Sequence, residues 1–103
     1  MRNHKAAGTA RERQVRKLLE EDGWIVIRAG ASLGPADLIA MKRDYLPMMI
    51  QVKATKAGVW TGFPPGDRAA LRRVALIAGA QGVLAHWPPR GELTWYNDDE
   101  WPM

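Results

Sequence analysis

The chain has 103 residues, a mass of 11.5 kDa and a formal net charge of +4, with 15 Lys and Arg against 11 Asp and Glu. A chain of this length supports one hydrophobic core, and an apolar share of 47% favours a folded domain over a disordered one. The absence of cysteine excludes disulfides, thiol nucleophiles and Cys-based metal sites. No apolar run approaches the about 20 residues of a membrane span, and no secretory signal is apparent. We therefore expect a single cytoplasmic domain at 1–103 that does not enter a membrane.

The positive charge is concentrated near the N-terminus, where six of the fifteen Lys and Arg residues lie between Arg2 and Lys17. We describe residues 1–8 as a basic arm, with Arg2 and Lys5 as candidate DNA contacts, and residues 97–103 as an acidic tail. A basic surface suits a polyanionic partner, because binding releases the counterions condensed on phosphates. Ordinary surface charge on a small domain is the alternative explanation.

The first half of the chain predicts a helix followed by three strands. A capping box formed by Thr9 and Glu12 predicts that the helix begins near residue 9, and Gly23 ends it. Alternating, β-branched or aromatic segments predict the strands at 24–27, 37–41 and 48–53. The last two strands form an antiparallel hairpin that turns near residue 44.

The second half predicts one helix and two strands. A loop rich in Gly and Pro spans 58–66, and Asp67 is a plausible N-cap for a helix at 68–78. Short strands follow at 83–87 and 93–96. The order α-β-β-β-α-β-β predicts an α/β fold in which a mixed β-sheet is flanked by helices.

Polar side chains converge on one face of the predicted hairpin. Gln51 and Lys53 point to the same side of their strand, and the turn near residue 44 places Asp37 opposite them. Carboxylate and amide oxygens suit Mg²⁺, and the Val52 carbonyl could be a further ligand. Lys53 could orient a water molecule or neutralise charge on a phosphate. Alternatively, Asp37 simply begins a strand and Lys53 is an ordinary exposed lysine.

Glu12 lies at the edge of the apolar stripe of the first helix, from where it points toward the sheet. The capping box alone accounts for a glutamate at this position. A carboxylate that caps a helix can also face a metal, so both roles stay open.

A series of short motifs runs through the first half of the chain. They are Gly8–Val15, Gly23–Arg28, Ser32, Asp37–Ala40 and Ile50–Lys53. In order and spacing they resemble the archaeal-type Holliday junction resolvases, which belong to the PD-(D/E)XK nuclease superfamily. The resemblance covers about half of the chain and continues loosely beyond it.

The resemblance implies a restriction-endonuclease-like fold and a role for each matching residue. Glu12 matches the acidic residue on the family's helix, Asp37 its metal-binding aspartate and Lys53 its catalytic lysine. Further matches are a serine near the active site and two basic residues that contact the DNA backbone: Ser32, Arg11 and Arg13. The region of the second helix matches one that helps to form a homodimer, which would place two active sites for opposed cuts.

The sequence departs from the family pattern at Gln51, where a carboxylate normally stands. At an effective dielectric of about 20, two unit charges about 4 Å apart interact by about 4 kcal/mol before desolvation. The missing charge should therefore weaken metal binding. The same Gln-x-Lys pattern occurs in active nucleases of the superfamily, including the short virus-type replication–repair nucleases.

Aromatic residues follow the predicted active-site strand. Trp60 and Phe63 lie in the loop at 58–66, with Lys56 nearby, and could stack on an exposed base. Packing of this loop onto the sheet is the alternative. His4 and His86 have no ligand partners at metal spacing, and we assign neither a role.

These observations predict a structure-selective DNA endonuclease that depends on Mg²⁺, with Mn²⁺ as a substitute, and resolves four-way junctions as a homodimer. Glu12, Asp37, Gln51, Lys53 and Ser32 would form its catalytic site. One alternative is another small PD-(D/E)XK nuclease that acts on other DNA structures. A second is a DNA-binding module that has the fold but no activity. The expected location is with the nucleoid, or with viral DNA in an infected cell.

Overall fold

The structure is a computed structural model that describes residues 4–29 and 34–102, including the side chains of 9–29 and 34–102. The helices are α1 (His4–Glu21) and α2 (Pro65–Ala78), and a short 3₁₀ helix, η2, spans Asp98–Glu100. The strands are β1 (Ile25–Arg28), β2 (Leu38–Met41), β3 (Met48–Lys53), β4 (Gln81–His86) and β5 (Thr94–Asn97). The predicted order α-β-β-β-α-β-β is confirmed.

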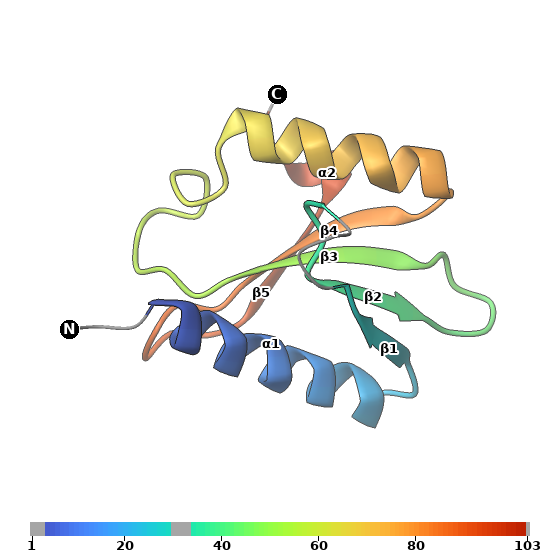
Figure 1. The fold of residues 1–103 in the computed structure, drawn as a ribbon, viewed down its shortest axis with the longest axis horizontal. Coiled ribbons are helices and arrows are strands. Elements are labelled where there is room, and N and C mark those ends of the chain that lie inside the picture. The colour runs from blue at the N-terminus through green and yellow to red at the C-terminus, as the bar shows by residue number, and fades with distance from the viewer. Residues whose placement is uncertain (1–3, 30–33, 103) are drawn as a thin grey trace.

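The strands form one five-stranded sheet in the order β1-β2-β3-β4-β5. Strands β3 and β4 are parallel, and every other neighbouring pair is antiparallel. A parallel pair needs a crossover connection, which α2 provides. Helices α1 and α2 cover opposite faces of the sheet (Figure 1). The predicted α/β fold with a mixed sheet between helices is therefore confirmed.

The two faces of the sheet carry separate apolar clusters. Against α1 lie inward-facing residues of the strands, including Leu38, Ile50 and Val52, together with Val15 and Leu19 of the helix. Against α2 lie Leu84, Phe63, Leu71 and Trp101. Side chains alternate along a strand, so Gln51 and Lys53 point to the opposite face from Ile50 and Val52, which is the α2 side. The sheet thus presents the Gln-x-Lys pattern on one defined face.

Helix α1 begins at His4, so the prediction that a capping box starts it near Thr9 is wrong. Ala6 and Ala7 are strong helix formers, and one glycine at position 8 costs only about 1 kcal/mol within a helix. Residues 4–8 of the predicted basic arm therefore belong to α1, and residues 1–3 lie outside the described residues. Glu12 sits within the helix, where no capping role explains it.

Helix α2 begins at Pro65, three residues before the predicted start, and Pro64 rather than Asp67 is its N-cap. A proline is favourable in the first turn because its fixed φ suits a helix and no N–H is lost there. Asp67 instead lies in the first turn, where its charge complements the helix dipole. The helix ends at residue 78, as predicted, and Gly79 caps it with φ 67°. Within the described residues, neither helix is long and apolar enough to cross a membrane.

The C-terminal segment packs on the fold. The carboxylate of Asp98 accepts hydrogen bonds from the Gly82 N–H and the Gln81 side chain, and Trp101 is buried. A Cβ at Gly82 would come within 3.1 Å of Trp101 and 3.2 Å of Asp98, so a larger residue there would crowd this contact. Gly82 therefore lies inside β4, and β4 begins two residues before the predicted strand. The predicted bounds of β3 are confirmed, and those of β1, β2 and β5 differ by one residue.

Candidate active site

The hairpin of β2 and β3 brings Asp37 to Gln51, as the sequence predicts. Leu38 pairs with Ile50, so Asp37, the residue before β2, lies opposite Gln51. The Asp37 N–H donates to the Ile50 carbonyl at 2.7 Å. The Asp37 oxygen Oδ2 accepts hydrogen bonds from the Gln51 amide at 2.9 Å and from the Val52 N–H at 2.8 Å. These two bonds hold the carboxylate in one orientation. Its other oxygen, Oδ1, takes part in neither of them.

Glu12 brings a second carboxylate from α1 to this end of the sheet. Its Oε1 lies 3.6 Å from Nε of Arg28, the last residue of β1, and only 19% of the glutamate side chain is exposed. Burial raises the pKa of Glu12, the negative charge of Asp37 raises it further, and Arg28 partly offsets both effects. Burial likewise raises the pKa of Asp37, opposed by the Val52 N–H and by Lys53 and Arg28. Two carboxylates thus interact in a partly buried place, where a cation would favour their ionised forms.

The oxygen atoms in this place fit a magnesium ion. No group of three His, Cys, Asp or Glu residues in the described ranges could hold a metal, so a site here must include other ligands. Gln51 meets Asp37 through its amide nitrogen, and a turn of this amide would bring its oxygen there instead. The Val52 N–H points at Asp37, and the carbonyl of a strand residue points to the same side as its N–H. Carboxylate, amide and carbonyl oxygens are all accepted ligands of Mg²⁺, which also retains waters.

Lys53 shares its face of β3 with Gln51. Burial raises the pKa of Asp37, and the positive charge of Lys53 offsets part of that rise. Within the described residues the Lys53 ammonium forms no hydrogen bond or ion pair. The Lys53 ammonium is therefore near the Asp37 carboxylate without bonding to it, and its role in catalysis stays a prediction.

A basic groove adjoins Glu12 along α1. This hollow of about 260 Å³ is lined by Thr9, Glu12, Arg13, Arg16, Arg28 and Leu38. The sequence analysis named Arg13 but gave no role to Arg16 or Arg28. Arg28 could have been found from the sequence, because it ends β1 and pairs with Leu38, the residue that follows Asp37. Three guanidinium groups in one groove are suited to a phosphate backbone.

Arg11 has a structural role that the sequence analysis missed. Its guanidinium lies 4.4 Å from the centre of the Trp87 ring and donates a hydrogen bond of 2.9 Å to the Pro88 carbonyl. These contacts fasten the connection between β4 and β5 to α1. Contact of Arg11 with DNA stays a prediction.

The aromatic loop after β3 packs mainly on the sheet. Phe63 is fully buried and meets the Trp101 ring edge-on at 5.0 Å, so the prediction that it stacks on a DNA base is wrong. Trp60 is half-buried between the Tyr96 ring at 5.2 Å and the Arg68 guanidinium at 5.6 Å. Its stacking on DNA stays a prediction.

Of the remaining predicted contacts, Lys56 is exposed in the loop after β3. Arg2 and Ser32 lie outside the described residues, as does the side chain of Lys5. Their roles stay predictions.

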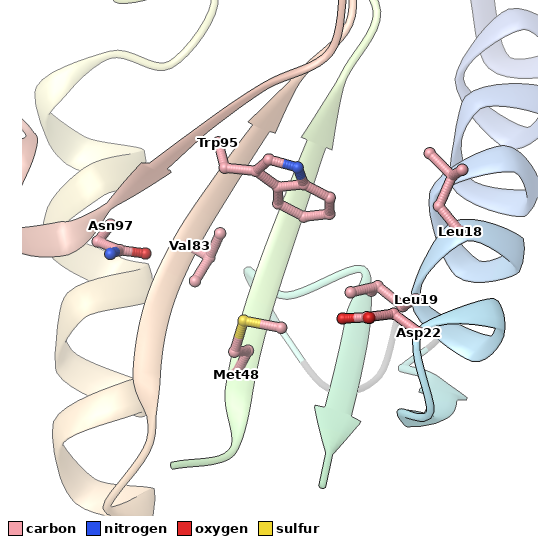
Figure 2. A pocket seen from close by; sticks show the side chains of 7 residues that line it. All are labelled: Leu18, Leu19, Asp22, Met48, Val83, Trp95 and Asn97. Atoms are coloured by element: carbon pink, nitrogen blue, oxygen red, sulfur yellow. The ribbon is translucent and has the colours of Figure 1, made fainter. Parts of the chain in front are cut away.

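A second hollow lies between the C-terminal half of α1 and the sheet, away from these carboxylates. It has a volume of about 300 Å³ and is lined by Leu18, Leu19, Asp22, Met48, Val83, Trp95 and Asn97. Figure 2 shows that its lining is mostly apolar, with Asn97 and Asp22 as the polar members and Asp22 as the charged one among these seven residues. A single carboxylate does not provide the paired groups of a hydrolytic site, so we place the chemistry at Asp37.

The fold, the acidic residue before β2 and the Gln-x-Lys pattern on β3 are consistent with the PD-(D/E)XK class of proteins. A sequence profile described as archaeal Holliday junction resolvase (Hjc) matches residues 3–96. The match spans well over half of the sequence, and the chain belongs to the archaeal Holliday junction resolvase family.

Comparison with solved structures supports the fold. Hjc of Archaeoglobus fulgidus, a Holliday junction resolvase from an archaeal hyperthermophile, matches with a TM-score of 0.71 and 24% sequence identity. The match covers 89% of this chain and 73% of that one. The comparison with curated proteins found no match.

Proposed function

We propose that the protein is a magnesium-dependent endonuclease that cleaves four-way DNA junctions, with Mn²⁺ able to replace Mg²⁺. The observation that carries the proposal is the Asp37 carboxylate, fixed by Gln51 and Val52 with Glu12 and Lys53 nearby. Membership of the resolvase family supports the choice of substrate. The protein would then act wherever branched DNA forms, on the nucleoid or on viral DNA.

The ion would be held by Asp37, Gln51 and the Val52 carbonyl, with Glu12 assisting. When bound it would polarise the scissile phosphate and lower the pKa of water. Side chains and backbone groups of the protein would position the ion's ligands, the attacking water and the DNA. The Gln51 amide and the Val52 N–H hold the Asp37 carboxylate in place before substrate arrives.

Lys53 would orient the attacking water and stabilise the negative charge that develops on the phosphate, because its ammonium has no other bound partner among the described residues. Arg28 holds Glu12 in position. The groove of Arg13, Arg16 and Arg28 would bind the backbone of the adjoining strand. Ser32 would lie near the phosphate by its match to the family.

Cleavage of a synthetic four-way junction and of a linear duplex with the same sequence tests this proposal. We expect the junction to be cut in the presence of Mg²⁺ or Mn²⁺, EDTA to stop the reaction, and the duplex to remain intact. Equal cutting of both substrates would identify another nuclease activity of the superfamily. Tight junction binding without cutting would identify a binding module.

We also propose that the protein acts as a homodimer through α2. Leu76 and Ile77 are 80% and 75% exposed on this helix, which is unusual for adjacent large apolar residues. A two-fold axis at this surface would bury both and present two active sites to the two strands that a junction resolvase must cut.

Replacing Leu76 and Ile77 together by Glu is expected to give a monomer, because burying the new charges in the interface would be unfavourable. Analytical ultracentrifugation would measure the change. Leu46→Glu is a matched control, since Leu46 is 63% exposed in the connection between β2 and β3. A double variant that sediments like the wild type would exclude α2 as the interface.

A further inference from the structure

His86 has a buried nitrogen without a hydrogen-bond partner. Within the described residues, its Nε2 is the one buried side-chain nitrogen or oxygen atom for which the structure provides none. A buried polar group without a partner costs free energy, and such groups are rare in native proteins. Nε2 of His86 therefore needs a hydrogen-bond partner, and one of the neighbouring side chains would have to turn to provide it.

The sheet places His86 directly beside Lys53. The two residues are partners in the parallel pair of β3 and β4, and the Trp87 N–H donates to the Lys53 carbonyl at 2.8 Å, which fixes this register. Neighbouring strands are about 4.8 Å apart, and paired residues point to the same face. The face is the one that carries Gln51, because Lys53 and Gln51 are two residues apart.

Lys53 needs an anchor as well. Its ammonium is held by no hydrogen bond or ion pair within the described residues, and only the charge of Asp37 attracts it. Gln51 cannot attract it as a carboxylate would, and the Gln51 amide N–H is already donated to Asp37. The flexible four-carbon stem of a lysine lets the ammonium turn toward a neighbour at small cost.

We propose that His86 is a positioning residue for Lys53, whose ammonium donates a hydrogen bond to Nε2 of the neutral imidazole. The imidazole then carries its proton on Nδ1. The bond would give the buried nitrogen its partner and would hold the cation beside Asp37 and Gln51. The contact itself does not depend on the proposed function, whereas its consequence for cleavage does.

The contact can be tested without any activity, by ¹H–¹⁵N NMR of the lysine ammonium groups in the full chain. We expect a slowly exchanging ammonium signal in the wild type that is absent in Lys53→Met, which distinguishes it from any signal of Lys42, whose ammonium donates to the Asp22 carbonyl at 2.6 Å. His86→Leu removes the acceptor, so the signal should disappear. His86→Gln keeps an acceptor near the position of Nε2, so the signal should return. A Lys53 signal that persists in His86→Leu, or that the wild type never shows, would overturn the proposal.

Cleavage provides the second readout. If the junction is the substrate, His86→Leu should lower kcat by about tenfold to a hundredfold, the effect of a misplaced catalytic group, with KM unchanged. His86→Gln should recover most of the rate. A kcat unchanged in His86→Leu would show that the histidine does not position Lys53 for catalysis. A wild type that shows the slow ammonium signal but cuts no DNA would refute the proposed function and leave the contact standing.

Thermal unfolding separates positioning from folding. His86→Leu removes the acceptor of the proposed hydrogen bond together with the cost of burying a polar atom, and because these two effects largely cancel, we expect its Tm to be close to that of the wild type. Loss of kcat together with a lowered Tm in both His86 variants, and with the ammonium signal unchanged, would assign His86 a structural role only.

Discussion

Replacing Asp37 by Asn is expected to abolish cleavage while the fold stays intact. The substitution removes the charge that would hold the metal, an interaction of several kcal/mol in the transition state, which corresponds to a loss of about 10²- to 10⁴-fold in rate. An asparagine oxygen in the place of Oδ2 can still accept from both the Val52 N–H and the Gln51 amide, because both bonds of the wild type end on that one oxygen. Cleavage of a labelled junction under single-turnover conditions measures the loss.

The same variant should be at least as stable as the wild type in EDTA at neutral pH. The pKa of Asp37 is raised in the folded protein, chiefly by burial, so the folded chain holds more protons than the unfolded chain between the ordinary and the raised pKa. Stability from this group is therefore greatest below its ordinary pKa and is lost as the pH rises through the raised one. Glu12 acts in the same direction.

Asp99→Asn is a suitable control for this experiment, because Asp99 is exposed in η2 and its loss changes the net charge equally. It should leave both cleavage and the pH dependence of Tm unchanged. Cleavage retained by Asp37→Asn would remove Asp37 from the catalytic site.

Replacing Gln51 by Glu is expected to change stability in opposite directions with and without magnesium. The Gln51 amide nitrogen lies 2.9 Å from the Asp37 oxygen, so a carboxylate there would face another carboxylate. In EDTA at neutral pH this repulsion should lower Tm. With Mg²⁺ the added charge should strengthen binding by about tenfold or more, from an interaction of up to about 4 kcal/mol at an effective dielectric of about 20.

The gain in Tm on adding Mg²⁺ measures this effect, because a ligand that binds only the folded chain stabilises it by mass action. Gln14→Glu is the matched control, since Gln14 is exposed on α1 and its side chain accepts a hydrogen bond from Arg11, away from Asp37. An unchanged response to Mg²⁺ in Gln51→Glu would show that residue 51 is not a ligand.

The hairpin could be predicted from the sequence because its geometry is local. A polar turn near residue 44 fixes the pairing of two short strands, and that pairing brings Asp37 to Gln51. The start of α1 could not be predicted, because the capping residues at Thr9 compete with the helix-forming tendency of the alanines before it. Local pattern alone does not decide that competition.

Features that depend on contacts distant in the sequence also escaped prediction. Phe63 and Trp60 look alike in a loop of glycines and prolines, and Phe63 is fully buried because it packs with Leu71 and with Leu84 and Trp101, which are distant in the sequence. The packing of Arg11 on Trp87 joins residues at opposite ends of the chain. The unpartnered nitrogen of His86 has no sequence signal, because it depends on how β4 is placed between β3 and β5.

The central place of β3 in the sheet has a consequence for how the protein meets its substrate. This strand carries Gln51 and Lys53 and is bonded on both edges, to β2 and to β4. It cannot be released without separating both halves of the sheet, so its amide exchange should require unfolding of the whole domain. Adjustment to the shape of a branched DNA must therefore come from the loops and helices around a rigid centre.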